Sequence, residues 1–203
     1  MKLAIVRGHR KGSQGATAGD GVTEYAFAGW LAARIVADAV GHECRVFERP
    51  DGPHYAHNMM GLVSEVNAWR PDLVLSLHFN ASPNGEPWSG TSALHWPSDA
   101  QGKTWAVQLS GFVARAIGLR NRGAKAQDRS WSKARKVDGE LRPAGPVLYI
   151  LRDTLAPTVL LETHFGSNPV DHAKAIQALE SGALSRAIVD ALPSPPASPS
   201  GSS

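Results

Sequence analysis

The stretch Leu73-Val74-Leu75-Ser76-Leu77-His78-Phe79-Asn80 decides how the rest of the chain is arranged. Its first half is almost continuously apolar, which is typical of a strand buried on both faces of a sheet. Residues 81–85 supply Ser, Pro, Asn and Gly, which favour a turn. The histidine near the end of this strand, His78, therefore lies where open α/β sheets place their ligands. Residues that share its function should reach the same edge of the sheet.

Further apolar runs alternate along the chain with segments of helical periodicity. Strands are expected at residues 3–6, 44–48, 91–96, 147–150 and 157–162, and helices at residues 23–40, 55–69, 101–118 and 171–192. The polar, glycine-rich residues 119–146 are expected to form a long loop with a short helix near residues 130–136. Strands that alternate with helices predict an α/β fold, a three-layer sandwich with a mainly parallel central sheet and helices on both faces.

The chain has 203 residues, which is enough for one domain, expected at residues 1–192. Residues 193–203 contain only Pro, Ser, Ala and Gly, and are predicted to be a disordered tail or the stub of a linker. The net charge of +3 comes without a dense Lys/Arg stripe, so no nucleic-acid partner is expected. No segment approaches the roughly 18 apolar residues of a membrane helix, so membrane insertion is not expected either.

Ionisable side chains stand at the ends of three expected strands. His9 follows the first strand, His78 lies near the end of the third, and Glu162 ends the last. Glu24 opens the helix after the first strand. Because parallel strands place their carboxyl ends at one edge, these four residues can converge on one crevice. Two histidines and a carboxylate with an open fourth position are a common ligand set for catalytic zinc, and the other carboxylate can then act as general base. Spacing leaves open which carboxylate binds metal, although Glu24 shares a βα unit with His9.

Three other features give weaker hypotheses. His54 and His57, three residues apart at a helix start, could hold a metal, but such residues are more often surface or capping groups. The glycine-rich loop after residue 7 lacks the Gly-x-x-x-x-Gly-Lys-Ser/Thr pattern of a phosphate-binding loop. The single cysteine, Cys44, excludes an intramolecular disulfide and a multi-cysteine zinc site.

Five segments then carry a family resemblance. In chain order they are Gly8-His9, Glu24, Ser76-Leu77-His78-Phe79-Asn80-Ala81, Arg122-Gly123-Ala124-Lys125 and Val159-Leu160-Leu161-Glu162-Thr163-His164-Phe165-Gly166-Ser167-Asn168. Together they resemble the motifs of the zinc-dependent N-acetylmuramoyl-L-alanine amidases (amidase type 3) of cell-wall enzymes and phage endolysins. The pair Ser-x-His-x-Asn-Ala and Leu-x-Glu-x-x-Phe-x-x-Asn in this order is specific. The resemblance spans about residues 1–192.

The resemblance implies that His9, Glu24 and His78 hold Zn²⁺ and that Glu162 is the catalytic glutamate. The expected reaction is hydrolysis of the amide between N-acetylmuramic acid and L-alanine in peptidoglycan, by a monomer. Glu162 would take a proton from the attacking water and return it to the leaving amine. The alternatives are a zinc peptidase that cleaves stem peptides and a non-catalytic wall-binding module. The presence of all four candidate residues, the three ligands and the catalytic glutamate, argues against a non-catalytic module.

The chain departs from the family pattern at several positions. Val6-Arg7 replaces a common Asp-Pro, and Arg10-Lys11 replaces a run of glycine, changes expected to alter substrate contacts. His164 stands two residues after Glu162, where strand spacing would put both on one face. His164 is therefore a candidate, with Asn80, for contacting substrate, and it could also stabilise the oxyanion; a turn residue pointing to solvent is the alternative. The stretch 127–146 is expected to be an insertion that shapes the groove.

The start of the sequence also predicts where the protein acts. The apolar stretch at residues 3–6 is too short for a signal peptide and is followed by Arg7. This favours a phage or prophage endolysin, synthesised in the cytoplasm and released through a holin lesion to reach the cell wall.

Overall fold

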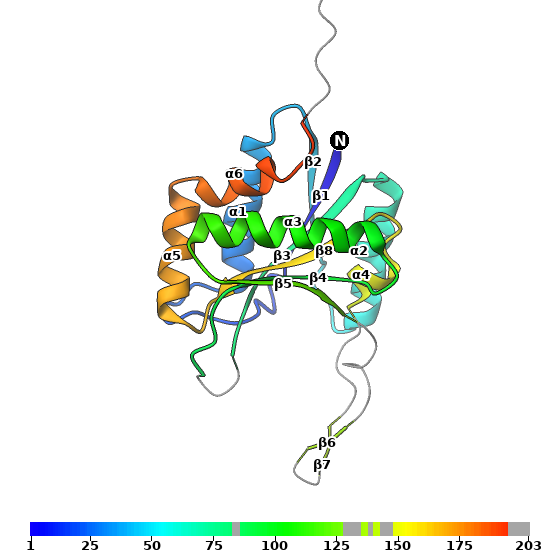
Figure 1. Ribbon diagram of the computed structural model, residues 1–203. Helices are drawn as coiled ribbons and strands as arrows, with labels where there is room; N and C mark the ends of the chain where they lie inside the picture. Colours follow the sequence, from blue (N-terminus) through cyan, green and yellow to red (C-terminus); the bar gives the residue numbers. More distant parts are fainter. Residues whose placement is uncertain (83–85, 128–134, 138–139, 143–147, 195–203) are drawn as a thin grey trace, which may run out of the picture.

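The computed structural model describes residues 1–82, 86–127, 135–137, 140–142 and 148–194 (Figure 1). Six strands form one sheet in the order β2-β1-β3-β8-β4-β5, and β6 pairs with β7 in a separate ribbon. The strands are β1 Lys2–Arg7, β2 Glu43–Glu48, β3 Leu73–Asn80, β4 Thr91–His95, β5 Asn121–Ala126, β6 Arg135–Val137, β7 Glu140–Arg142 and β8 Thr158–Phe165. The helices are α1 Glu24–Asp38, α2 Tyr55–Trp69, α3 Ala100–Ile117, α4 Tyr149–Asp153, α5 Pro169–Glu180 and α6 Ala183–Asp190.

The central sheet is mainly parallel, as the sequence predicted. β1 runs parallel to β2 and to β3, β3 runs parallel to β8, and β4 runs parallel to β5. The antiparallel pairing of β4 with β8 makes the sheet mixed. Because β1, β3 and β8 are neighbours with the same direction, their carboxyl ends lie side by side at one edge of the sheet.

Alternating strand residues divide the hydrophobic core between the two faces of the sheet. In β1, Leu3 and Ile5 join the cluster under α1, α3, α5 and α6, whereas Ala4 and Val6 join the cluster under α2 and α4. The same alternation continues through β3 and β8. The predicted three-layer α/β sandwich is therefore confirmed, and Figure 1 shows α2 and α4 together on the side away from α1, α5 and α6.

The start of α1 is fixed by a local hydrogen bond. Thr23 is the N-cap, and its hydroxyl accepts a hydrogen bond from the backbone N–H of Ala26 at 3.2 Å. Glu24 is thereby placed in the first helical turn, at the same end of the sheet as the carboxyl ends of β1 and β3. No helix among the described residues is long and apolar enough to cross a membrane.

Two element predictions in the second half of the chain were wrong. Residues 121–126, expected to lie in a loop, form edge strand β5, whose polar sequence Asn-Arg-Gly-Ala-Lys-Ala gives no apolar alternation. A strand was expected at residues 147–150, but Tyr149 and Ile150 instead begin helix α4, with Ile150 and Leu151 buried in the cluster under α2. A short apolar run does not distinguish a buried strand from a buried helix.

Other expectations were corrected in part or fall on residues that are not described. The helix expected at residues 171–192 is two helices, because Gly182 at φ 74° adopts a left-handed conformation between α5 and α6. Of the short helix expected near residues 130–136, Arg135 and Lys136 belong to strand β6, and the rest lies outside the described residues. Most of the expected tail, from residue 195 onward, also lies outside them.

Leu161 tests the packing of the central strand. It is fully buried in β8 and pairs with Leu77 on one side and Ala93 on the other. We expect Leu161→Ala to lower the free energy of unfolding by about 2–5 kcal/mol, because the neighbouring strands cannot collapse into the space. Urea unfolding measures this change. Leu155→Ala, at a side chain that is 87% exposed, is the control and should change stability by less than about 0.5 kcal/mol. If Leu161→Ala and Leu155→Ala both changed the free energy of unfolding by the same small amount, Leu161 would not be packed in the core as described.

Candidate metal centre and active site

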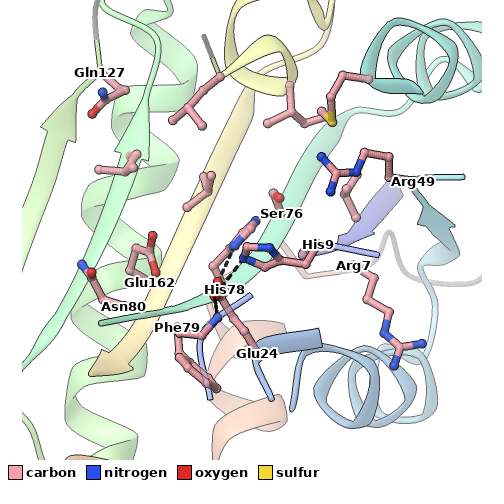
Figure 2. A pocket seen from close by; sticks show the side chains of 18 of the residues that line it. Arg7, His9, Glu24, Arg49, Ser76, His78, Phe79, Asn80, Gln127 and Glu162 are labelled. Carbon is pink, nitrogen blue, oxygen red and sulfur yellow. Dashed lines mark hydrogen bonds and ion pairs between the residues drawn. The ribbon is translucent and has the colours of Figure 1, made fainter. Parts of the chain in front are cut away.

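The carboxyl ends of β1, β3 and β8 open into a cavity of about 650 Å³. The four residues singled out from the sequence line it: His9 after β1, Glu24 at the start of α1, His78 in β3 and Glu162 in β8. Figure 2 shows His9, Glu24 and His78 grouped together, with Glu162 on the neighbouring strand. The structure therefore brings together residues that lie far apart in the sequence.

The carboxylate of Glu24 lies between two imidazole rings. Its Oε1 is 2.6 Å from Nδ1 of His78, and its Oε2 is 2.8 Å from Nε2 of His9 (Figure 2). The ligand atoms of the three residues all lie within 4.8 Å of one another. Each comes from a different element, so the fold rather than one local motif builds the group.

The loop after β1 closes around this group through unusual backbone conformations. His9 has φ 65°, in the left-handed region that non-glycine residues rarely occupy. Gly15 has φ 78°, and a Cβ there would lie 2.6 Å from both Glu24 Oε2 and His9 Nε2. The backbone N–H of Ala16 donates to Glu24 Oε2 at 3.2 Å. Glycine at position 15 leaves the space between the ligand atoms free while the backbone still approaches them.

The ionisation of Glu24 suits a metal ligand. Burial alone would raise the pKa of Glu24, but the hydrogen bonds with His78 and His9 outweigh it and lower the pKa to about 2. Glu24 is therefore a carboxylate at neutral pH. Two imidazole nitrogens and one carboxylate oxygen are donors that zinc accepts, so these residues fit a zinc ion.

Glu162 is arranged differently from Glu24, although both are acidic. It pairs with His78 across the β3–β8 register, so the two side chains are neighbours on one face. Its Oε2 is buried without a hydrogen-bond partner among the described residues. Burial raises the pKa of Glu162 to about 7; the charge of Glu24 adds to this effect, and His78 and Lys125 oppose it. Glu162 can therefore accept and release a proton near neutral pH.

His164 does not reach the cavity. The β3–β8 register shifts after the His78–Glu162 pair, so that Asn80 pairs with Phe165 and β8 has one additional residue. His164 is fully buried and is not among the residues that line the cavity; its ring lies 4.9 Å from the ring of Phe27 in α1. The expectation of a turn residue pointing to solvent was wrong, and the same-face spacing with Glu162 was broken by the irregular register.

The structure separates the remaining sequence candidates. Asn80 lines the cavity, and its side-chain oxygen accepts a hydrogen bond from the backbone N–H of Ala81 at 2.9 Å. His54 and His57 are exposed near the start of α2 and are not part of the three-residue ligand group. Neither His54 nor His57 is among the residues that line the cavity.

Two basic residues that line the cavity were not identified from the sequence. Arg49 follows β2 directly, and Lys125 lies in β5. The strand-end argument that selected His9 applies equally to Arg49, because β2 is the parallel neighbour of β1. Lys125 is part of the Arg122–Lys125 segment, but its position in the cavity depends on β5, which sequence periodicity does not show.

The chain is thus an α/β domain with three residues, His9, Glu24 and His78, that could hold a metal ion. Residues 3–194 match a family model described as N-acetylmuramoyl-L-alanine amidase, and the chain belongs to this family. A comparison with curated proteins found no match.

Several solved structures have the same fold. The catalytic domain of CD27L, an endolysin targeting Clostridia difficile, is 26% identical with a TM-score of 0.74, over 94% of this chain and 96% of that one. The catalytic domain of CwlV, an N-acetylmuramoyl-L-alanine amidase from Bacillus (Paenibacillus) polymyxa var. colistinus, is 19% identical with a TM-score of 0.73, over 94% of each chain. Ami1 from Mycobacterium smegmatis is 18% identical with a TM-score of 0.68, also over 94% of each chain.

The raised pKa of Glu162 predicts a cost in stability that depends on pH. Because its pKa of about 7 in the folded protein lies above the ordinary 4.5, its protonation contributes stability that is complete below pH 4.5 and is lost as the pH rises through 7. In metal-free protein with chelator, the stability of Glu162→Gln relative to the wild type should therefore increase as the pH rises from 4.5 through 7. We expect a gain on the order of 1 kcal/mol at pH 8, since the side chain is partly exposed.

Thermal unfolding of both proteins from pH 4 to pH 8 measures this gain. Glu180→Gln is the control, because Glu180 is an exposed carboxyl at the end of α5. A stability difference between Glu162→Gln and the wild type that does not change with pH would contradict the assigned environment of Glu162.

Proposed function

We propose that this protein hydrolyses the amide between N-acetylmuramic acid and L-alanine in peptidoglycan, with a zinc ion held by His9, Glu24 and His78 and with Glu162 as the catalytic glutamate. The observation that carries the proposal is the pairing of Glu162 with His78 in one cavity, where Glu162 Oε2 lies beside the ligand group and has no hydrogen-bond partner within the described ranges. Membership of the amidase family supports the substrate and the bond.

Zinc at this site supplies Lewis acidity toward a water molecule and toward the scissile carbonyl. The transfer of the proton is carried out by a residue of the chain. Glu162 Oε2 accepts a proton from the attacking water as the water oxygen bonds to the carbonyl carbon. The same oxygen then gives that proton to the departing nitrogen as the carbon–nitrogen bond breaks. The products are the lactyl carboxylate of the sugar and a free amino terminus on L-alanine.

Glu24 and Asn80 have supporting functions in this proposal. Glu24 stays ionised because its pKa is about 2, so its carboxylate is available as a metal ligand together with the two histidines. Asn80 uses its side-chain oxygen to accept from Ala81, which leaves its amide NH₂ for the substrate. Apolar side chains on the α2 and α4 side, including Met59, Leu62 and Ile150, keep water from that part of the cavity.

We also propose that the protein acts as a monomeric phage or prophage endolysin in host lysis, reaching the wall through a holin lesion. The likeness to the CD27L endolysin catalytic domain supports this role.

Substitutions at Glu162 and His78 should separate catalysis from metal binding. Glu162→Gln should lose at least about 100-fold in wall lysis while zinc stays near one ion per chain, because it removes the proton acceptor and no ligand. His78→Ala should lose both lysis and zinc. Turbidity loss of purified cell walls and metal analysis of the same samples measure these effects. A lytic Glu162→Gln would show that another group is the base, and a zinc-containing His78→Ala would show other ligands.

Analysis of the digested wall identifies the bond. We expect new L-alanine amino termini on intact stem peptides and unbroken sugar chains, and no such products after treatment with a chelator. Adding Zn²⁺ to the chelated protein should restore them. Shortened stem peptides would instead show a zinc peptidase, and binding without any product would show a non-catalytic wall-binding module.

A further inference from the structure

Arg49 is a cationic side chain in the cavity whose charge no acidic residue among those described neutralises. It follows β2 and lines the cavity, and its Nε is buried without a hydrogen-bond partner in the described part of the chain. The neighbouring arginines are paired: Arg7 contacts Glu48 at 2.7 Å, and Arg10 contacts Asp51 at 2.8 Å. A buried N–H group of a guanidinium that has no acceptor costs free energy. Arg49 is therefore suited to bind an anion that enters the cavity and supplies that acceptor.

The position of Arg49 is fixed by an aromatic ring. Its guanidinium carbon lies 4.8 Å from the centre of the Tyr55 ring, at the start of α2. Figure 2 shows the Arg49 guanidinium extending into the cavity toward Ser76. Glu162 lies on the opposite side of the cavity. Burial lowers the pKa of Arg49, but an arginine remains charged at neutral pH. Arg49 is therefore a positioned, charged donor.

The acidic side chains of the cavity lie apart from Arg49. Figure 2 shows Glu162 on the opposite side of the cavity from Arg49, with the two histidines between them. Lys125 lies near Glu162 and partly offsets its charge. The cavity lining also includes the apolar residues Val6 and Leu160, which offer a carboxylate no hydrogen bond.

We propose that Arg49, supported by Tyr55, forms a subsite that binds a free carboxylate of the stem peptide, namely the α-carboxylate of the D-glutamate that follows L-alanine. This assignment rests on the proposed function, because it places L-alanine at the ligand group. The D-glutamate carboxylate is the substrate carboxylate nearest to the cleaved amide. Carboxylates accept two parallel N–H bonds from a guanidinium, whereas a carboxamide offers one acceptor oxygen and repels the second donor. The subsite therefore selects acidic over amidated stem peptides.

Equilibrium binding of short peptides to the zinc-loaded protein tests the subsite without any bond cleavage. The probes are L-alanyl-γ-D-glutamyl-L-lysinamide with the D-glutamate α-carboxylate free, and the same peptide with that group as a carboxamide. By calorimetry the wild type should bind the acid about tenfold more tightly or better, as expected for a charge-assisted pair. Arg49→Gln should bind both peptides with the weaker, amide-like affinity. Its zinc content and Tm show whether it is folded.

Arg45→Gln is the matched control. Arg45 lies in the same strand, β2, pairs with Glu65 at 2.7 Å and is not among the cavity residues, so the variant should keep the wild-type preference. A third peptide, with the D-glutamate amidated and the C-terminal carboxylate free, separates the two carboxylates of the stem. A preference that appears only for this peptide would overturn the D-glutamate assignment.

The binding result is independent of the proposed reaction. Equal affinities for acid and amide, a preference that survives in Arg49→Gln, or no binding of the acid at millimolar concentration would each overturn the subsite, even if the digested walls show amidase products. An Arg49-dependent preference in a protein that releases no L-alanine amino termini would support the subsite and overturn the amidase proposal.

Discussion

The buried carboxylate of Glu24, held between His9 and His78, is the interaction on which the site depends. An ionised carboxyl inside a protein is costly unless it is paired and hydrogen-bonded. Here the partners are His9 in the loop after β1, His78 in β3 and the Ala16 backbone N–H. This loop pairs with the start of α1, where the backbone N–H groups of Glu24 and Tyr25 donate to Ala16 and Gln14, and it contains the left-handed residues His9 at φ 65° and Gly15 at φ 78°. The strain is local, and the group it assembles is the one that fits zinc.

The two carboxyl groups of the cavity are distinguished by their partners rather than by chemistry or depth. Burial acts in the same direction on both, toward a higher pKa. Glu24 has two imidazoles as hydrogen-bond partners, and its pKa falls to about 2; Glu162 has none among the described residues, and its pKa rises to about 7. Environments that separate the pKa values of two acidic groups assign one to a fixed charge and the other to proton transfer. Spacing in the sequence left open which glutamate is the ligand, and this difference supports Glu24.

The sequence predicts the parts of the fold that are determined by local pattern. β1, β3 and β8 are apolar because both of their faces are covered, so they could be identified and their ends aligned. β5 is a strand only because β4 offers a partner, and its own residues are polar. Helix α4 was predicted as a strand because four apolar residues fit either structure. Arg49 was missed because the strand-end argument was applied only to histidine and carboxylate side chains.

The irregular register of β8 explains why Glu162 and His164 end in different places. Two residues apart on a regular strand, they would share a face. The additional residue after Glu162 leaves Glu162 beside His78 and turns His164 into the core, 2.9 Å from His172 on α5. The hydroxyl of the intervening Thr163 lies 2.9 Å from His164 and 3.2 Å from the carbonyl oxygen of His78. The same irregularity thus anchors the backbone of one proposed ligand through Thr163, while Glu162 Oε2 has no hydrogen-bond partner among the described residues. A regular strand would place a further titratable ring beside Glu162, in addition to His9 and His78.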